Sequence, residues 1–173
     1  MVSIRPFRED DRQAVVRLWQ SVFLDPPPHN DPDRDITRKL GVQRDLFLVA
    51  EEGNGILGTA MAGFDGHRGW VYYVAVHPEH RRRGIGAALM SSVERRMADS
   101  GCPKVNLQVK SSNLRAVSFY RHLGYETEER ISMSKRLAPE SNALERDEPA
   151  AHDAVREGTR GPEIDREAET PAR

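Results

Sequence analysis

One stretch of the sequence constrains the fold more than any other: a buried-strand pattern leads through a basic turn into a glycine-rich helix start. Residues 70–76 are apolar or aromatic and rich in β-branched side chains, as in a central strand. Three arginines follow at 81–83, and Gly84 and Gly86 then open a helical pattern. The first N–H groups of a helix lack intrahelical partners and carry positive charge, and glycine lets an anion approach them closely. We therefore expect a pyrophosphate cradle here, with arginines as further donors, rather than a solvated arginine run.

Two other phosphate-binding motifs do not fit this stretch. A P-loop requires a lysine followed by serine or threonine after its last glycine, and none stands here. The dinucleotide fingerprint G-x-G-x-x-G fails because Leu89 occupies the position of the third glycine. The cradle must therefore belong to another class.

Strand and helix patterns alternate on both sides of the cradle, which indicates an α/β (α+β) fold. Residues 15–23 place apolar side chains on one helical face. Asp31 followed by Pro32 is typical of a helix start, and the glycines at 53 and 55 mark a hairpin turn. The predicted order is β-α-α-β-β-β-α-β-α-β. The expected strands are 2–5, 46–50, 56–63, 70–76, 105–109 and 125–135, and the expected helices are 10–24, 31–40, 84–100 and 113–123.

The composition changes sharply after Leu137. Residues 138–173 contain no aromatic residue, four prolines, ten acidic and five basic side chains, which gives this segment a net charge of −5. The whole chain carries −1, so residues 1–137 carry about +4. Such a segment buries too little apolar surface to offset the entropy lost on ordering. We expect one folded domain over 1–137 and a disordered acidic tail over 138–173.

The motif Arg-x-x-Gly-x-Gly after a strand resembles the acetyl-CoA motif of the GNAT N-acetyltransferases. Residues 107–126 resemble the second signature of that family, at the family's spacing from the first, and the resemblance covers nearly all of residues 1–137. Within the family, 30–32 and 63–69 resemble the bacterial YpeA-type branch. The resemblance implies a mixed, mostly antiparallel sheet with splayed central strands and helices on both faces.

The resemblance also implies which residues hold acetyl-CoA and which one acts in the reaction. Tyr120 is expected to be the catalytic general acid that protonates the leaving thiolate, and the Val76 N–H to donate to the thioester carbonyl. The local sequence predicts that Asn113 is the N-cap of its helix, and the resemblance implies in addition a polar contact with CoA. No metal is expected. The expected acetyl-CoA-binding residues are Val74, Ala75, Val76, Arg81, Arg82, Arg83, Gly84, Ile85, Gly86, Ala87 and Asn113.

The sequence leaves open which group acts as the general base. Relatives that acetylate ribosomal-protein N-termini have a glutamate where this chain has Gln108, which accepts no proton near pH 7. A water chain to solvent is an alternative to a side chain. The side chains that could replace the glutamate are Glu51, Glu52, Asp65, His67, Tyr72 and Tyr73.

These observations predict an enzyme that transfers acetyl from acetyl-CoA to a primary amine of a small molecule or protein, directly, in a ternary complex. The alternative is a non-catalytic module that senses acetyl-CoA. The near-neutral charge gives no reason to expect nucleic acid or a membrane surface as partner, and no apolar run reaches the length of a membrane span. A single cysteine and a start without an apolar signal core favour the cytoplasm. We expect a monomer or homodimer.

Overall fold

The computed structural model describes residues 1–24, 30–135 and 137. The chain divides into two compact units, Met1–Ser132 and Met133–Arg173. The sheet and the helices of the described residues belong to the first unit. The predicted acidic tail, residues 138–173, lies outside the described residues.

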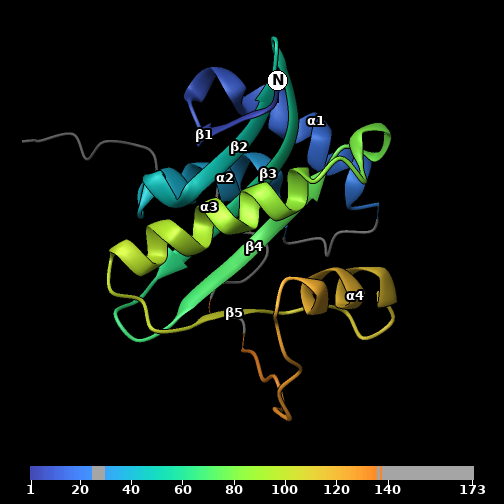
Figure 1. Ribbon diagram of the computed structural model, residues 1–173. Helices are drawn as coiled ribbons and strands as arrows, with labels where there is room; N and C mark the ends of the chain where they lie inside the picture. The colour runs from blue at the N-terminus through green and yellow to red at the C-terminus, as the bar shows by residue number, and fades with distance from the viewer. Residues whose placement is uncertain (25–29, 136, 138–173) are drawn as a thin grey trace, which may run out of the picture. The chain divides into compact units, whose positions relative to one another are not determined.

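Five strands form one mixed sheet in the order β1-β2-β3-β4-β5 (Figure 1). Neighbouring strands are antiparallel from β1 to β4, and β5 lies parallel to β4. The mostly antiparallel mixed sheet is therefore confirmed. The strands span Ser3–Pro6, Phe47–Glu52, Gly55–Phe64, Gly69–Val76 and Val105–Leu107.

Helices cover both faces of this sheet, as predicted. On one face α3 (Ile85–Asp99) packs on a cluster that includes Leu48 and Ala60, and on the other α1 (Arg12–Val22) and α2 (Pro32–Leu40) enclose one that includes Phe47 and Val49. Successive residues of β2 thus enter opposite clusters, because side chains alternate across a strand. A fourth helix, α4 (Leu114–His122), follows β5 and packs Phe119 and Tyr120 against the α3 cluster, as does Leu123 directly after the helix.

Local sequence signals account for the start of α2 and for the end of α3. At α2 the Asp31 side chain accepts a hydrogen bond from the Arg34 N–H at 2.8 Å, and Pro32 occupies the first turn. The end of α3 closes at Gly101, which has a φ of +79° and lets the Cys102 N–H reach the Met97 carbonyl at 2.9 Å.

The predicted strand over residues 125–135 is wrong, because no residue there is in a strand. Its alternating pattern finds no backbone ladder along the three-residue β5. Among the described residues, side chains tie the segment to the sheet region: Lys104 pairs with Glu128, and Gln108 Nε2 donates to Ser132 Oγ at 2.7 Å. Alternation predicts a strand only where a neighbouring strand supplies hydrogen-bond partners.

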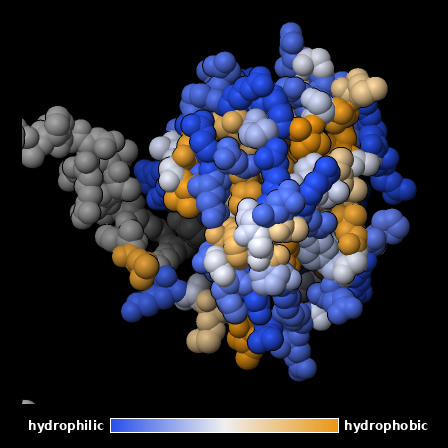
Figure 2. All heavy atoms as spheres, turned by 60° about the vertical axis from the view of Figure 1, so that its left-hand side comes forward, coloured by the Kyte–Doolittle hydropathy of each residue, from blue (hydrophilic) through white to orange (hydrophobic). Residues whose placement is uncertain are grey.

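The surface of the described residues mixes polar and apolar side chains. Figure 2 shows hydrophobic residues in separate groups among hydrophilic ones on the face that it draws. None of the helices in the described part of the chain combines the length and the apolar character needed to cross a bilayer.

Candidate active site

The edge of β4 that faces β5 is open over its second half. The two strands pair only from Gly69↔Val105 to Val71↔Leu107, so residues 72–76 have no β5 partner. The His77 N–H donates to the Leu57 carbonyl of β3 at 2.8 Å. Because successive N–H groups of a strand point to opposite edges, the Val76 N–H points to the open edge. An extended ligand could therefore hydrogen-bond along this half of β4.

A β-bulge in β4 marks the start of the open edge. The register runs from Thr59↔Ala75 to Met61↔Tyr72, so β4 has one residue more than β3 over this interval. Tyr73 takes up the difference with a φ of +50°, a left-handed conformation that is uncommon for a bulky side chain. Bulges bend a strand away from its neighbours, which accounts for the parting of β4 from β5.

Buried hydrogen bonds hold this strained residue in place. The Thr59 hydroxyl, which is fully buried, donates to the Tyr73 carbonyl at 2.8 Å and accepts from Trp19 Nε1 at 2.8 Å. The Trp19 ring stacks on the Tyr73 ring with a centroid distance of 4.0 Å. Helix α1 and strand β3 thus fix the bulge together.

The start of α3 has the free N–H groups expected of an anion site. Gly84 precedes the helix with a φ of +78°, and the first intrahelical bond runs from the Ala88 N–H to the Gly84 carbonyl. Among the described residues, no side chain caps the N–H groups of Ile85, Gly86 and Ala87. A glycine is required at position 84 for its backbone conformation and not for lack of space, because a Cβ there would meet nothing within 4 Å.

Gly86 has a packing role that the sequence did not indicate. A Cβ at this position would lie 3.1 Å from Phe119 Cζ of α4 and 3.7 Å from Val76 Cγ2. The absence of a side chain therefore lets α4 approach the start of α3. The two helices meet beside the open edge of β4.

The three arginines do not act as one group. Arg83 turns away to Glu52, with an N–O distance of 2.9 Å, and donates to His80 Nδ1 at 2.8 Å. Arg81 Nε donates to the Val76 carbonyl at 3.3 Å. Arg82 has a positive φ of 66°, and its side chain makes no hydrogen bond to the described residues. Arg81 and Arg82 are therefore better placed than Arg83 to bind a phosphate.

Tyr120 lies on α4 and packs against the same cluster as Val74 and Val76. Its ring makes edge contacts with Phe119 and Tyr125, at centroid distances of 5.0 and 5.7 Å. Burial raises the pKa of Tyr120 to about 12, so the hydroxyl keeps its proton at neutral pH. A proton donor requires that state.

Asn113 is the N-cap of α4, which confirms the plain interpretation of this residue. Its side-chain oxygen accepts a hydrogen bond from the Ala116 N–H at 3.1 Å. The residue is exposed, so its amide nitrogen remains open to a ligand. The expected contact with CoA stays a prediction.

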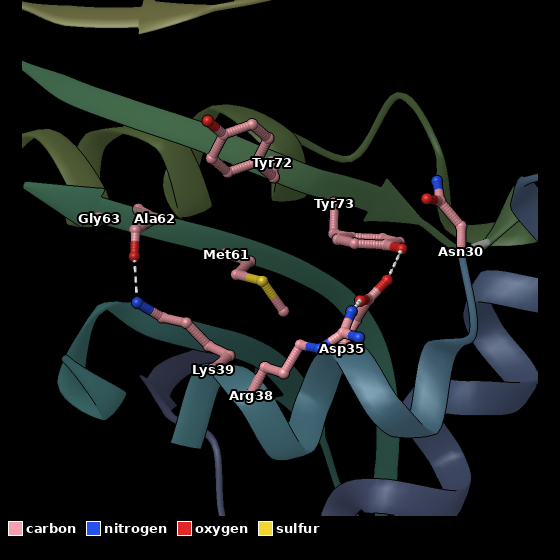
Figure 3. A pocket seen from close by; sticks show the side chains of 9 residues that line it. All are labelled: Asn30, Asp35, Arg38, Lys39, Met61, Ala62, Gly63, Tyr72 and Tyr73. Carbon is pink, nitrogen blue, oxygen red and sulfur yellow. Dashed lines mark hydrogen bonds and ion pairs between the residues drawn. The ribbon is translucent and has the colours of Figure 1, made fainter. Parts of the chain in front are cut away.

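A hollow of about 430 Å³ lies beside the bulge, between α2 and strands β3 and β4 (Figure 3). The Tyr73 hydroxyl donates to Asp35 Oδ2 at 2.6 Å, and Arg38 pairs with the other Asp35 oxygen at 3.3 Å. Burial and the bond to Asp35 both raise the pKa of Tyr73. The lining residues are Asn30, Asp35, Arg38, Lys39, Met61, Ala62, Gly63, Tyr72 and Tyr73.

Lys39 is a half-buried cation in this lining. Its ammonium donates to the Ala62 carbonyl (Figure 3). In the part of the chain that the structure describes, no carboxylate lies within ion-pair distance of it. Burial alone lowers the pKa of Lys39 to about 8.

The carboxylates named from sequence as possible bases are all held in other interactions. Glu51 is bound by Arg5, Glu52 by Arg83, and Asp65 accepts the backbone N–H groups of its own turn. These hydrogen bonds lower the pKa of each carboxylate. None of the three lines the hollow, whereas Asp35 does.

Of the remaining candidate bases, Tyr72 and Tyr73 line the hollow and His67 does not. Burial, with the charge of Asp65, raises the pKa of the exposed Tyr72, which lines the hollow beside Tyr73. His67 is exposed in the β3–β4 turn. Gln108 donates to Ser132 Oγ. The structure thus brings Tyr72, Tyr73 and Asp35 together and leaves His67 in a separate turn.

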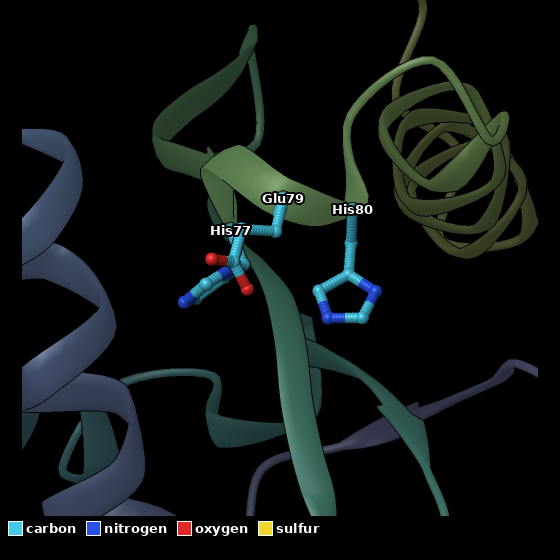
Figure 4. A group of neighbouring side chains, drawn as sticks. All are labelled: His77, Glu79 and His80. Carbon is cyan, nitrogen blue, oxygen red and sulfur yellow. The ribbon is translucent and has the colours of Figure 1, made fainter.

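His77, Glu79 and His80 form a group whose ligand atoms all lie within 4.8 Å of one another (Figure 4). A metal ion suits this group poorly. His80 Nδ1 already accepts from the Arg83 guanidinium, whose positive charge opposes a second cation. His77 Nδ1 is buried and finds no hydrogen-bond partner among the described residues. The expectation that the site uses no metal stays a prediction.

The sequence did not point to Asp35 or Lys39. Their spacing of four residues puts them on one face of α2, but that spacing is common on exposed helices. Only the packing of α2 against the bulge shows that this face lines a hollow.

Comparisons with known proteins agree with this architecture. Residues 12–125 match the acetyltransferase (GNAT) family. An acetyltransferase of Pectobacterium atrosepticum is 48% identical over 136 residues, which cover 79% of this chain and 96% of the relative. An acetyltransferase of Sodalis glossinidius is 46% identical over 137 residues, with the same coverage of 79% and 96%.

Solved structures show the same fold at low sequence identity. An aminoglycoside N-acetyltransferase in complex with CoA has a TM-score of 0.66 at 20% identity, covering 80% of this chain and 96% of that chain. The ribosomal-protein-S18-alanine N-acetyltransferase of Escherichia coli has a TM-score of 0.61 at 20% identity, covering 72% and 77%. The sequence relatives and the shared fold agree, and the chain belongs to the acetyltransferase (GNAT) family and is an N-acetyltransferase.

Proposed function

We propose that this enzyme transfers the acetyl group of acetyl-CoA directly to a primary amine in a ternary complex. One observation carries the proposal: the open half of β4 ends beside the uncapped start of α3. The extended arm of acetyl-CoA would lie along residues 74–76. Its pyrophosphate would bind the N–H groups of residues 85–87, with Arg81 and Arg82 as further donors.

Chemistry at the thioester requires an oxyanion donor and a proton for the leaving thiolate. The Val76 N–H, which points to the open edge, would donate to the carbonyl oxygen as it becomes negative. Tyr120, whose hydroxyl is protonated at neutral pH, would give its proton to the departing sulfur. The amine nitrogen bonds to the acetyl carbon, the carbon–sulfur bond breaks, and CoA leaves as the thiol.

The amine must lose a proton before or during attack. We place the acceptor in the hollow beside Tyr73, next to the open half of β4. Asp35 is the candidate acceptor of this proton, directly or through water, because among the carboxylates considered it alone lines the hollow. We do not assign this role to Glu51, Glu52 or Asp65, because none of them lines the hollow.

The test measures CoA release from acetyl-CoA with a panel of amines, amino acids, peptides and aminoglycosides. Aminoglycosides belong in the panel because one structural neighbour is named for them. We expect poor turnover of these polycations, since Arg38 and Lys39 outnumber Asp35 in the lining.

Tyr120→Phe then examines the mechanism with any acceptor that is turned over. It keeps the ring and removes the proton donor, so kcat should fall by about 10²–10⁴-fold while acetyl-CoA affinity stays nearly constant. Tyr125→Phe is the matched control, because its hydroxyl bonds to Glu94 and its loss should affect stability rather than turnover. A Tyr120→Phe variant with unchanged kcat would remove Tyr120 from the reaction.

A further inference from the structure

We propose that the acetyl acceptor is a small amine that also carries a carboxylate, and that Lys39 binds this carboxylate in the hollow between α2 and β4. The inference rests on the proposed function, because it takes this hollow as the acceptor site. It adds the chemical class of the substrate and a residue that selects it.

The charges in the lining are the first argument. Asp35 is already matched by the Tyr73 hydroxyl at 2.6 Å and by Arg38 at 3.3 Å. The Lys39 ammonium bonds only to the Ala62 carbonyl among the described residues, which leaves two of its three donors for a ligand. A half-buried ammonium without a counter-ion is costly unless a ligand supplies the anion.

Among the residues that the structure describes, Asp35 is the one carboxylate in the lining around Lys39. The titratable groups in the lining besides Lys39 are Asp35 and Arg38 on α2, and Tyr72 and Tyr73 on β4. Strand β3 contributes the Met61 side chain and the backbone of residues 62 and 63. Desolvation alone accounts for the lowered pKa of Lys39, with no neighbouring carboxylate raising it.

The spacing along α2 is the second argument. Asp35 and Lys39 are four residues apart, which puts their Cβ atoms roughly 5–6 Å apart on one face of the helix. A carboxylate bound by Lys39 therefore leaves the rest of a small molecule near Asp35 and Tyr73. At that end an ammonium can share the Asp35 carboxylate with Tyr73 and Arg38, since a carboxylate offers about four acceptor sites. The bulge leads from there to residues 74–76.

The size and lining of the hollow fit a ligand of this kind. A volume of about 430 Å³ is in the range of small-molecule sites. The rings of Tyr72 and Tyr73 and the side chain of Met61 offer apolar contact between the two polar ends. An amino acid or a short peptide with a free carboxylate combines these features.

The experiment compares matched acceptors at pH 7. The panel consists of L-amino acids and dipeptides, each beside its own carboxamide, and the readout is kcat/KM for CoA release. Lys39→Met keeps the length and apolar bulk of the side chain and removes the charge. We expect it to lower kcat/KM by at least about tenfold for the carboxylates and by much less for the carboxamides, which lack the negative charge.

Two further variants separate this effect from a general loss of charge or fold. Arg17→Met removes an exposed positive charge from α1 and should change neither class of acceptor. Lys39→Arg keeps the charge and should retain part of the carboxylate preference. The ratio of wild-type to Lys39→Met kcat/KM should fall as the pH rises through about 8, the pKa of Lys39 in the free enzyme.

Each other outcome overturns a defined part of the reasoning. Equal loss on acids and amides, or no loss at all, refutes the role of Lys39. Acetyl-CoA binding without turnover of any panel member refutes the class of acceptor and leaves the donor site standing. A chain that does not bind acetyl-CoA in calorimetry refutes the proposed function itself, and this inference with it.

Discussion

Replacing Thr59 by valine removes one hydroxyl and takes a partner from one buried and one part-buried group. The Trp19 N–H loses its acceptor and the Tyr73 carbonyl loses its donor, both now at 2.8 Å from the Thr59 oxygen. Water cannot replace the hydroxyl readily, because Thr59 is fully buried and Trp19 is 1% exposed. The side chain keeps its shape, so the change isolates the hydrogen bonds.

The expected cost follows from these two groups. A buried polar group left unpaired costs about 1–3 kcal/mol, or about 2–6 kcal/mol for two. The added methyl group returns about 1 kcal/mol of apolar burial. We expect a net loss near 3 kcal/mol in the free energy of unfolding, which corresponds to a fall in Tm of about 6–12 °C for a chain of this size.

Urea unfolding and calorimetry measure this loss, with Thr59→Ser as the matched control. Serine keeps the hydroxyl and removes one methyl group, so it should cost only about 1 kcal/mol. A double-mutant cycle with Trp19→Phe should show a coupling of about 0.5–3 kcal/mol. A valine variant as stable as the serine variant would refute the assignment of the bulge to this pair of hydrogen bonds.

Three further predictions concern the helix start, an ion pair and the tail. Gly84→Ala should weaken acetyl-CoA binding in calorimetry and lower the free energy of unfolding by about 1–2 kcal/mol, because alanine disfavours a φ of +78°. Gly53→Ala, at a φ of +60° in the β2–β3 turn, should lower stability similarly without affecting binding. Burial alone would raise the pKa of Asp11, but hydrogen bonds dominated by Arg5 lower it. This stabilisation is present above about pH 4 and is lost as the pH falls further, so Asp11→Asn should flatten the fall in unfolding free energy below about pH 4. Deleting residues 138–173, whose composition predicts no packed core, should leave Tm within a few degrees, and a larger drop would show that the segment packs on the domain.

The sequence by itself determined the order of the elements from β1 to α4 and predicted the location of the acetyl-CoA cradle. Both depend on signals within one or two turns of chain: apolar periodicity in α1, the Asp31 cap of α2, and the Gly-x-Gly start of α3. Such signals act through local backbone sterics and hydrogen bonds, so they can be interpreted without knowledge of distant residues.

The tertiary structure alone decided which side chains meet. Position 86 needs a glycine because Phe119 packs against it, and Arg83 forms an ion pair with Glu52. The segment 125–135 forms no strand because no neighbouring strand pairs with it. The hollow that we assign to the acceptor depends on a bulge held by residues from α1 and β3. These contacts join residues from 14 to 40 positions apart, and their energies arise only once the chain has brought those segments together.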